Sequence, residues 1–186
     1  QWQAVMGGNP SQFHAPANPV EKVSWDDIQT FVSRLNAADQ RGVPSDKTRR
    51  TAMKMRYALP TEAQWAYACR AGTTTAFCFG DAPPMLGQYG WSKDNSGGGT
   101  QPAGGLKANA WGLYDMHGNV WEWCADWFDE AYYANSPADD PVNSAASSFR
   151  VVRGGSWRNT AGRCRAACRG GESPGGRSDI LGFRLA

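Results

Sequence analysis

Histidine is scarce in this chain, and long apolar runs are missing from it. Only His14 and His117 occur among the 186 residues. A metal centre that requires three histidine ligands is therefore impossible within one chain. No apolar run approaches the roughly 20 residues that a membrane-spanning helix needs, so the sequence predicts no transmembrane segment.

An excess of charge is also lacking. The net charge is +2, and no basic tract precedes the arginine-rich C-terminus. This argues against a nucleic-acid partner. The sequence begins at Gln1 without a signal-like segment. We therefore expect an N-terminal part of the full protein to be missing, and the lack of a targeting segment says nothing about the compartment.

Cysteines are few, and their number is odd. They are Cys69, Cys78, Cys124, Cys164 and Cys168. Five cysteines are too sparse for a disulfide scaffold and leave the redox environment open. Cys164 and Cys168 are four residues apart, so they could pair or share a metal. Their alanine neighbours and the lack of a nearby histidine favour two separate thiols.

The overall composition is that of a folded domain. Hydrophobic residues make up 41% of the chain and charged residues 19%, which is typical of globular proteins. The 22 glycines and 11 prolines are spread along the sequence and predict many turns and loops. We expect residues 1–186 to form a single domain with a sizeable core.

Two helices are predicted in the first half of the chain. After a turn-rich lead-in over residues 1–19, Ser24 and Asp27 resemble a capping box, and apolar residues recur at helical spacing over 25–37. Residues 40–55 are interpreted as a solvated basic loop. A short strand over 57–60 leads into the second helix. Thr61 caps that helix, and Gln64 completes the capping box. The helix has three inward-facing residues, Trp65, Ala68 and Cys69, and it ends at Gly72.

The second half of the chain is predicted to contain short strands between loops. Alternation over Gly112–Trp123 and the residues after it places Glu122 and Trp123 on opposite sides of an extended segment. Buried carboxylates there need hydrogen-bond partners or a cation. Residues 151–157 are predicted to be a strand that enters a glycine bend, and residues 180–185 a final strand.

Six motifs in order carry a family resemblance. They are Val23-Ser24-Trp25, Leu59-Pro60-Thr61-Glu62-Ala63-Gln64-Trp65, Cys69-Arg70-Ala71-Gly72, Gly112–Trp123, Arg153-Gly154-Gly155-Ser156-Trp157 and Gly182-Phe183-Arg184. Over nearly its whole length the sequence resembles the formylglycine-generating-enzyme-like (sulfatase-modifying factor) family. The resemblance implies an α+β, C-type-lectin-like fold of that subclass, with two helices, a small twisted antiparallel sheet and extensive ordered loops.

The resemblance also bears on catalysis. Oxidase members of the family hold copper with two cysteines after the Arg-Gly-Gly-Ser motif. Asn159 stands at the first of these positions, and Cys164 falls near the second. Asparagine offers no thiolate, so we expect no copper chemistry. The iron-dependent branch needs a set of histidines that this chain lacks, so we expect no iron. His117 is interpreted as a structural hydrogen-bonding residue.

A structural calcium ion is implied by the resemblance. Its ligands would be the side chains of Asp115 and Glu122 and the carbonyl oxygens of Gly118 and Val120, an oxygen-only set that suits a hard cation. The alternative is that backbone N–H groups and arginines hold both carboxylates without a metal. A second calcium site known in the enzymes fits residues 93–99 poorly.

The C-terminal segment resembles the variable region of lectin-fold proteins that are diversified by retroelements. Framework residues of 153–184 are interleaved with small and polar ones, and a rigid scaffold tolerates changes in such loops. The candidate ligand-binding residues are Trp157, Arg158, Asn159, Thr160, Gly162, Cys168, Gly170, Gly171, Glu172, Ser173, Gly175, Gly176, Arg177, Ser178 and Asp179. The alternative is an ordinary family member with an idiosyncratic loop.

These observations favour a non-enzymatic binding protein. Its C-terminal loops, framed by Trp157 and the arginines, would bind a protein or other macromolecule. A second hypothesis is a copper-dependent oxidase that forms formylglycine, disfavoured by Asn159. A third is an accessory domain of the family with an unknown ligand. We expect a cell-surface or extracytoplasmic location.

Overall fold

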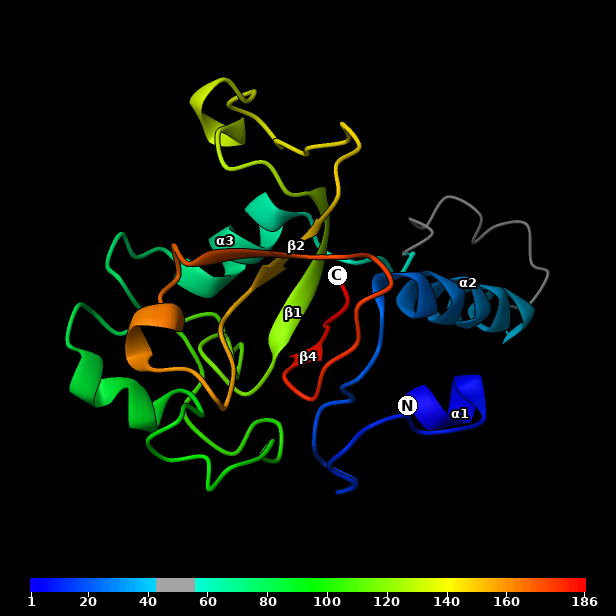
Figure 1. Ribbon diagram of the computed structural model, residues 1–186, viewed down its shortest axis with the longest axis horizontal. Coiled ribbons are helices and arrows are strands. Elements are labelled where there is room, and N and C mark those ends of the chain that lie inside the picture. Colours follow the sequence, from blue (N-terminus) through cyan, green and yellow to red (C-terminus); the bar gives the residue numbers. More distant parts are fainter. Residues whose placement is uncertain (43–55) are drawn as a thin grey trace.

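The computed structural model describes residues 1–42 and 56–186. Short helices and a small sheet are joined by long ordered loops (Figure 1). The helices are α1 (Trp2–Met6), α2 (Trp25–Gly42) and α3 (Glu62–Arg70), with 3-10 turns at η2 (Pro83–Gln88), η3 (Tyr132–Ala134) and η4 (Ala161–Arg163). The strands are β1 (Trp121–Trp127), β2 (Arg150–Arg153), β3 (Arg169–Glu172) and β4 (Leu181–Gly182). Within the described residues no helix is both long and apolar enough to span a membrane.

The four strands form one sheet in the order β3-β2-β1-β4. The pairs β1/β2 and β2/β3 are antiparallel, whereas β4 runs parallel to β1. The sheet is therefore mixed, and the predicted wholly antiparallel sheet is wrong at this edge. Of the final strand predicted over 180–185, only Leu181–Gly182 joins the ladder.

The helix α2 confirms the predicted cap and exceeds the predicted length. Asp27 N–H donates to Ser24 Oγ at 3.1 Å, and Ser24 N–H donates to Asp27 Oδ2 at 2.9 Å. The helix runs to Gly42 rather than to residue 37, because residues 37–41 contain no glycine or proline that would end it. The rest of the basic segment, residues 43–55, lies outside the described residues.

Two other predictions for the first 60 residues are wrong. The lead-in contains the helix α1, which is placed by Trp2 stacking on Phe31 with ring centroids 5.0 Å apart. The segment 57–60 is not a strand. There, Ala58 exchanges two backbone hydrogen bonds with Ala186, which fixes the C-terminus beside the start of α3. Both outcomes depend on contacts that are distant in sequence.

The capping box of α3 is confirmed. Gln64 N–H donates to Thr61 Oγ1 at 3.1 Å, and the Gln64 side chain accepts from Thr61 N–H at 2.9 Å. Ala71, with a left-handed φ of 47°, closes the helix just before Gly72. Trp65 and Cys69 are buried as predicted.

The alternation along β1 sorts its side chains between two core clusters. Trp121 and Trp123 join a cluster with Ile28 and Phe31 of α2. Cys124 joins a second cluster with Trp65 of α3. The sheet therefore has α2 packed on one face and α3 on the other, and the predicted sidedness of β1 is confirmed.

The glycine bend after β2 is also confirmed. Gly154 and Gly155 have φ angles of 96° and 76°, which L side chains rarely adopt. A Cβ atom on Gly155 would lie 2.7 Å from Cys164 Sγ. The bend directs the chain from the sheet into the C-terminal segment that contains the candidate site.

Candidate ligand-binding face

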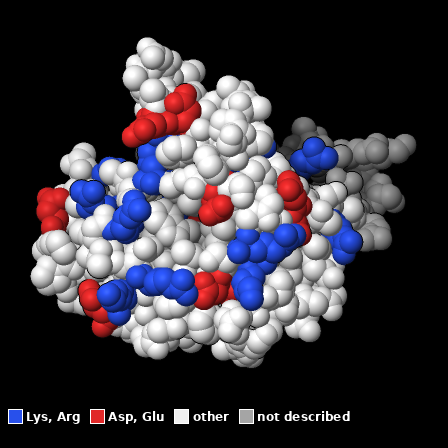
Figure 2. All heavy atoms as spheres, in the orientation of Figure 1, with Lys and Arg blue, Asp and Glu red and all other residues white. Residues whose placement is uncertain are grey.

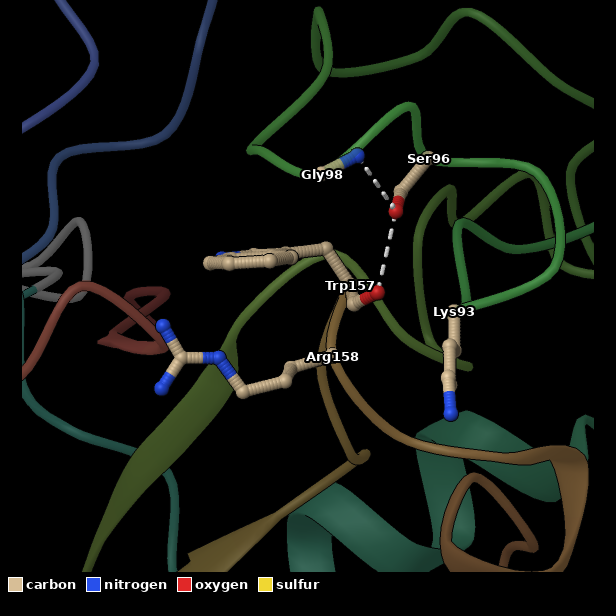
Figure 3. A pocket seen from close by; sticks show the side chains of 5 residues that line it. All are labelled: Lys93, Ser96, Gly98, Trp157 and Arg158. Atoms are coloured by element: carbon tan, nitrogen blue, oxygen red, sulfur yellow. Dashed lines mark hydrogen bonds between the residues drawn. The ribbon is translucent and has the colours of Figure 1, made fainter.

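Two shallow hollows lie on the surface formed by the C-terminal segment. The first hollow, of about 280 Å³, is lined by Lys93, Ser96, Gly98, Trp157 and Arg158 (Figure 3). The second hollow, of about 230 Å³, is lined by Trp121, Val152, Arg163, Arg169, Gly170, Gly171, Glu172, Ser178, Ile180 and Leu181. Of the candidate residues, two line the first hollow and four the second.

The first hollow is built around the Trp157 indole. Its Nε1–H donates to Asp179 O at 3.0 Å, and the Arg158 guanidinium lies 4.7 Å from the ring centroid. Figure 3 shows the Arg158 side chain extending along one face of the ring. Ser96 Oγ–H donates to Trp157 O at 3.0 Å and so attaches the 93–98 loop to this residue. Trp157 is only 8% exposed, so it forms a wall of the hollow and not a projecting anchor.

The second hollow lies against the edge strand β3. Trp121 and Val152 are buried and form an apolar floor. A Cβ atom on Gly170 would lie 3.0 Å from Val152 Cγ2, and one on Gly171 would lie 2.9 Å from Phe128 Cγ. The glycines are thus required for β3 to lie close to its neighbours. The sequence predicts a loop at these two glycines, whereas they lie in the strand β3.

Asn159 connects the two hollows. Its Oδ1 accepts hydrogen bonds from Trp121 Nε1–H at 2.9 Å and from Ser156 Oγ–H at 2.8 Å. Its carbonyl oxygen accepts from Lys93 N–H at 2.9 Å. The side chain of Asn159 therefore bonds Trp121 of the second hollow, and its backbone bonds Lys93 of the first.

The candidate residues differ in their accessibility. Exposed members are Arg158, Thr160, Gly162, Gly171, Ser173, Gly175 and Arg177. Half-buried members are Asn159, Cys168, Gly170, Glu172, Gly176, Ser178 and Asp179. Both arginines among the candidates are exposed and tied to carboxylates: Arg158 to Asp179 at 2.9 Å and Arg177 to Asp27 at 2.8 Å. The segment is thus fixed by ion pairs and is not a set of free loops.

The position of the oxidase cysteines holds no reactive thiolate pair. Asn159 occupies the first position, with its side chain bonded as described above. Cys164 is fully buried, and burial raises the pKa of its thiol to about 12. All five cysteines are free thiols in the structure, so Cys164 and Cys168 do not form a disulfide. In the absence of a metal, a thiol with this pKa stays protonated at neutral pH and is a poor nucleophile.

His117 has the structural role predicted for it. Its Nδ1 donates to Cys164 O at 2.8 Å, and its Nε2 accepts from Cys78 N–H at 3.1 Å. Burial lowers the pKa of His117 to about 4. Both ring nitrogens are therefore used by the scaffold in the neutral form.

The carboxylates of the predicted calcium site differ in their surroundings. Glu122 accepts from Arg184 Nη2–H and Trp65 Nε1–H, both at 2.6 Å. Asp115 accepts from Gly104 N–H at 2.7 Å, but its Oδ1 is buried and has no hydrogen-bond partner among residues 1–42 and 56–186. Burial raises the pKa of Asp115. A calcium ion would gain a free oxygen from Asp115 and would have to share Glu122 with Arg184, so calcium binding stays a prediction.

Several residues of the face were missed by the sequence analysis. The 93–98 loop was considered only as a poor calcium site, yet it supplies Lys93 and Gly98 to the first hollow. The signal available was its glycine run, since Gly97 and Gly98 have φ angles of 65° and 89°. Arg169 was treated as framework, but it lines the second hollow and pairs with buried Glu62 at 2.7 Å. No local pattern in the sequence joins positions 93 and 157.

The fold defines a class, an α+β scaffold built on a small mixed sheet. The model of the sulfatase-modifying factor enzyme 1-like domain matches residues 1–186, and the chain belongs to this family. The chain is 32% identical over 200 residues to a formylglycine-generating enzyme of Streptomyces coelicolor, with 100% of this chain and 57% of that protein covered. The chain thus spans little more than half of that relative.

Solved structures give a complementary result. Treponema denticola variable protein 1 is similar with a TM-score of 0.87 and 33% identity, over 99% of this chain and 79% of that one. PvdO from Pseudomonas aeruginosa follows with a TM-score of 0.78 and 26% identity, over 93% and 63% of the two chains. These likenesses confirm the predicted α+β, C-type-lectin-like fold of the formylglycine-generating-enzyme subclass.

Proposed function

We propose that this chain is a non-enzymatic binding protein that displays residues 157–179 on a lectin-like scaffold to a protein or other macromolecular ligand. The two hollows, about 280 and 230 Å³ in volume, offer apolar walls and charged rims on one face. Such a combination is typical of recognition surfaces. The similarity to a protein that is itself called a variable protein supports this reading.

The environment of Asn159 is the observation that carries the proposal. By family resemblance this position holds a copper-binding cysteine in the oxidases. Here the side chain accepts hydrogen bonds from Trp121 and Ser156. Its neighbour in that chemistry, Cys164, is buried with a thiol pKa of about 12. By the same resemblance the chemistry needs a pair of thiolates, and an asparagine at position 159 supplies none.

A copper-dependent oxidase that forms formylglycine is the second candidate, and the 32% identity to such an enzyme favours it. The test is copper loading followed by incubation with a peptide that contains a Cys-x-Pro-x-Arg motif, with a formylglycine-generating enzyme assayed in parallel. We expect no aldehyde product by mass spectrometry. Turnover by this chain would overturn the binding-protein proposal.

Diversification by a retroelement is a separate part of the proposal. It predicts that the neighbouring DNA encodes a reverse transcriptase and contains a near-copy of the segment for residues 153–184 that differs only at adenines. Finding neither would leave an accessory domain of the family with a fixed ligand. The cell-surface or extracytoplasmic location likewise stays a prediction, and fractionation of the source cells would test it.

A further inference from the structure

The charges of this chain are divided unevenly along its length. Residues 153–184 contain seven arginines against only two carboxylates, Glu172 and Asp179, a net charge of +5. The remaining residues contain twelve lysines and arginines against fifteen carboxylates, a net charge of −3. The small net charge of the whole chain therefore hides a basic segment that coincides with the proposed binding face.

Most of these arginines are already neutralised by the scaffold. Arg153 and Arg169 share the buried carboxylate of Glu62, at 3.2 and 2.7 Å. Arg184 pairs with Glu122, and the pairs Arg158–Asp179 and Arg177–Asp27 lie at the surface. Within residues 1–42 and 56–186, the structure gives no ion pair to Lys93, Arg163 or Arg165.

Two of these uncommitted cations line the hollows. Lys93 lines the first hollow and Arg163 lines the second, and both side chains are exposed. Figure 3 shows Lys93 across the hollow from Arg158, with its amino group bonded to none of the residues drawn. Figure 2 shows lysine and arginine side chains spread over the viewed face of the molecule, with acidic groups among them. Each hollow thus combines a tryptophan with one cation that has no ion pair among the described residues.

The aromatic rings of the face favour a protein over a nucleic acid. Single-stranded nucleic acids bind by stacking bases on exposed aromatic faces. Trp157 and Trp121 are only 8% and 9% exposed, and Arg158 already covers the Trp157 ring. Glu172 lies in the second hollow and would repel a continuous row of phosphates. An acidic peptide needs no exposed ring, and a single carboxylate at Arg163 meets less repulsion from Glu172 than a continuous row of phosphates does.

We propose that this face binds an acidic segment of a partner protein, with one carboxylate at Lys93 in the first hollow and another at Arg163 in the second. This inference rests on the proposed binding function and names its ligand class. Asn159 keeps the two contacts in a fixed relation, because its backbone bonds Lys93 and its side chain bonds Trp121 of the second hollow. The pre-set spacing would favour partners whose acidic groups match it.

The test is selection of random dodecapeptides displayed against the immobilised protein. We expect the recovered peptides to be enriched in Asp and Glu over the starting library. For the strongest peptide, synthesised with a fluorophore, Lys93→Glu and Arg163→Glu should each weaken binding about tenfold, as charge reversal at a contact does. Lys107→Glu is the matched control, because Lys107 is exposed and lines neither hollow. Glu172→Gln should strengthen binding, since it removes the repelling carboxylate.

The outcomes separate this inference from the proposed function. Ser178→Trp fills the second hollow. If the recovered peptides are neutral or basic and this variant blocks their binding, the acidic ligand class is overturned and the proposed binding function is retained. Peptides insensitive to Ser178→Trp and to both charge reversals, or no enriched peptide, would overturn both. Equal binding of single-stranded DNA and of the peptide, with the same dependence on Lys93 and Arg163, would overturn the assignment to protein.

Discussion

The indole N–H of Trp121 donates to Asn159 Oδ1 at 2.9 Å, so a residue of the central strand is held by the position that bears a cysteine in the oxidases. Ser156 donates to the same oxygen at 2.8 Å. The amide side chain of Asn159 thus connects the sheet to the C-terminal segment, at a position where the family resemblance implies a catalytic cysteine in the oxidases.

Replacement of Asn159 should therefore affect stability. In Asn159→Ala, Trp121 Nε1–H and Ser156 Oγ–H lose their acceptor, and we expect the free energy of unfolding to fall by about 1–3 kcal/mol. Urea denaturation measures this change. Thr160→Ala is the control, because Thr160 is exposed and its side chain caps η4 with no hydrogen bond in the part of the chain that the structure describes. Equal stability of the two variants would contradict the role assigned to Asn159.

The glycines of the C-terminal segment should differ in their tolerance of side chains. Gly171→Asn would place a Cβ atom 2.9 Å from Phe128 Cγ, whereas no atom lies within 4 Å of the corresponding position at Gly175. We expect Gly171→Asn to lower the free energy of unfolding by about 1–3 kcal/mol through overpacking and Gly175→Asn to change it little. Thermal and urea unfolding of the two variants check this. Similar stabilities of the two variants would show that β3 can shift to accommodate a side chain at position 171.

Glu62 should be the most sensitive carboxylate of the scaffold. It is 1% exposed and pairs with both Arg153 and Arg169. Removing one partner of a buried charge network leaves the other charges uncompensated, and such losses are typically about 3–5 kcal/mol. Glu62→Gln should therefore unfold at much lower urea. In contrast, Arg158→Ala breaks a surface pair with Asp179, for which about 0–1 kcal/mol is expected. A Glu62→Gln variant as stable as Arg158→Ala would contradict the assignment.

The stability of the fold should fall with acid as His117 is protonated. Its pKa is lowered from 6.5 to about 4 by burial. In the unfolded chain His117 binds a proton below about pH 6.5, whereas in the folded chain it does so only below about pH 4. The contribution of neutral His117 to the free energy of unfolding is therefore complete above about pH 6.5 and is lost as the pH falls toward about 4. The lowered pKa corresponds to about 3 kcal/mol. NMR titration of the His117 ring protons isolates this group, and titration of the ring between pH 6 and 7 would refute the prediction.

Calcium should stabilise the fold if Asp115 and Glu122 share an ion. Asp115 Oδ1 is buried without a partner, and a cation would supply one. We expect the midpoint of thermal unfolding to rise with added calcium and to fall with EDTA, because a ligand of the native state stabilises it. Asp115→Asn should weaken the effect, and magnesium, with its stricter geometry, is the control. An unfolding midpoint that changes with neither EDTA nor calcium would refute the calcium prediction.

Local signals allowed much of the scaffold to be predicted. The Ser24–Asp27 and Thr61–Gln64 boxes lie within four residues of sequence, and both form as expected. The glycine bend at 154–155 is likewise a local demand for positive φ. Such features depend on neighbouring residues, so a single sequence shows them. The edge strand β3 was missed because its four residues, Arg169 to Glu172, include two glycines and have no strand propensity of their own.

The sequence by itself determined the family, the two capped helices and the aromatic strand β1, and its family resemblance predicts that Asn159 stands at a cysteine position of the oxidases. Only the tertiary structure decided what the replacement does, that Glu122 is held by Arg184, and that Lys93 stands beside Trp157. The Asn159–Trp121 contact spans 38 residues of the sequence and the Arg184–Glu122 contact spans 62. Local preferences do not encode them, because they arise when separate segments are brought together by burial of a shared core.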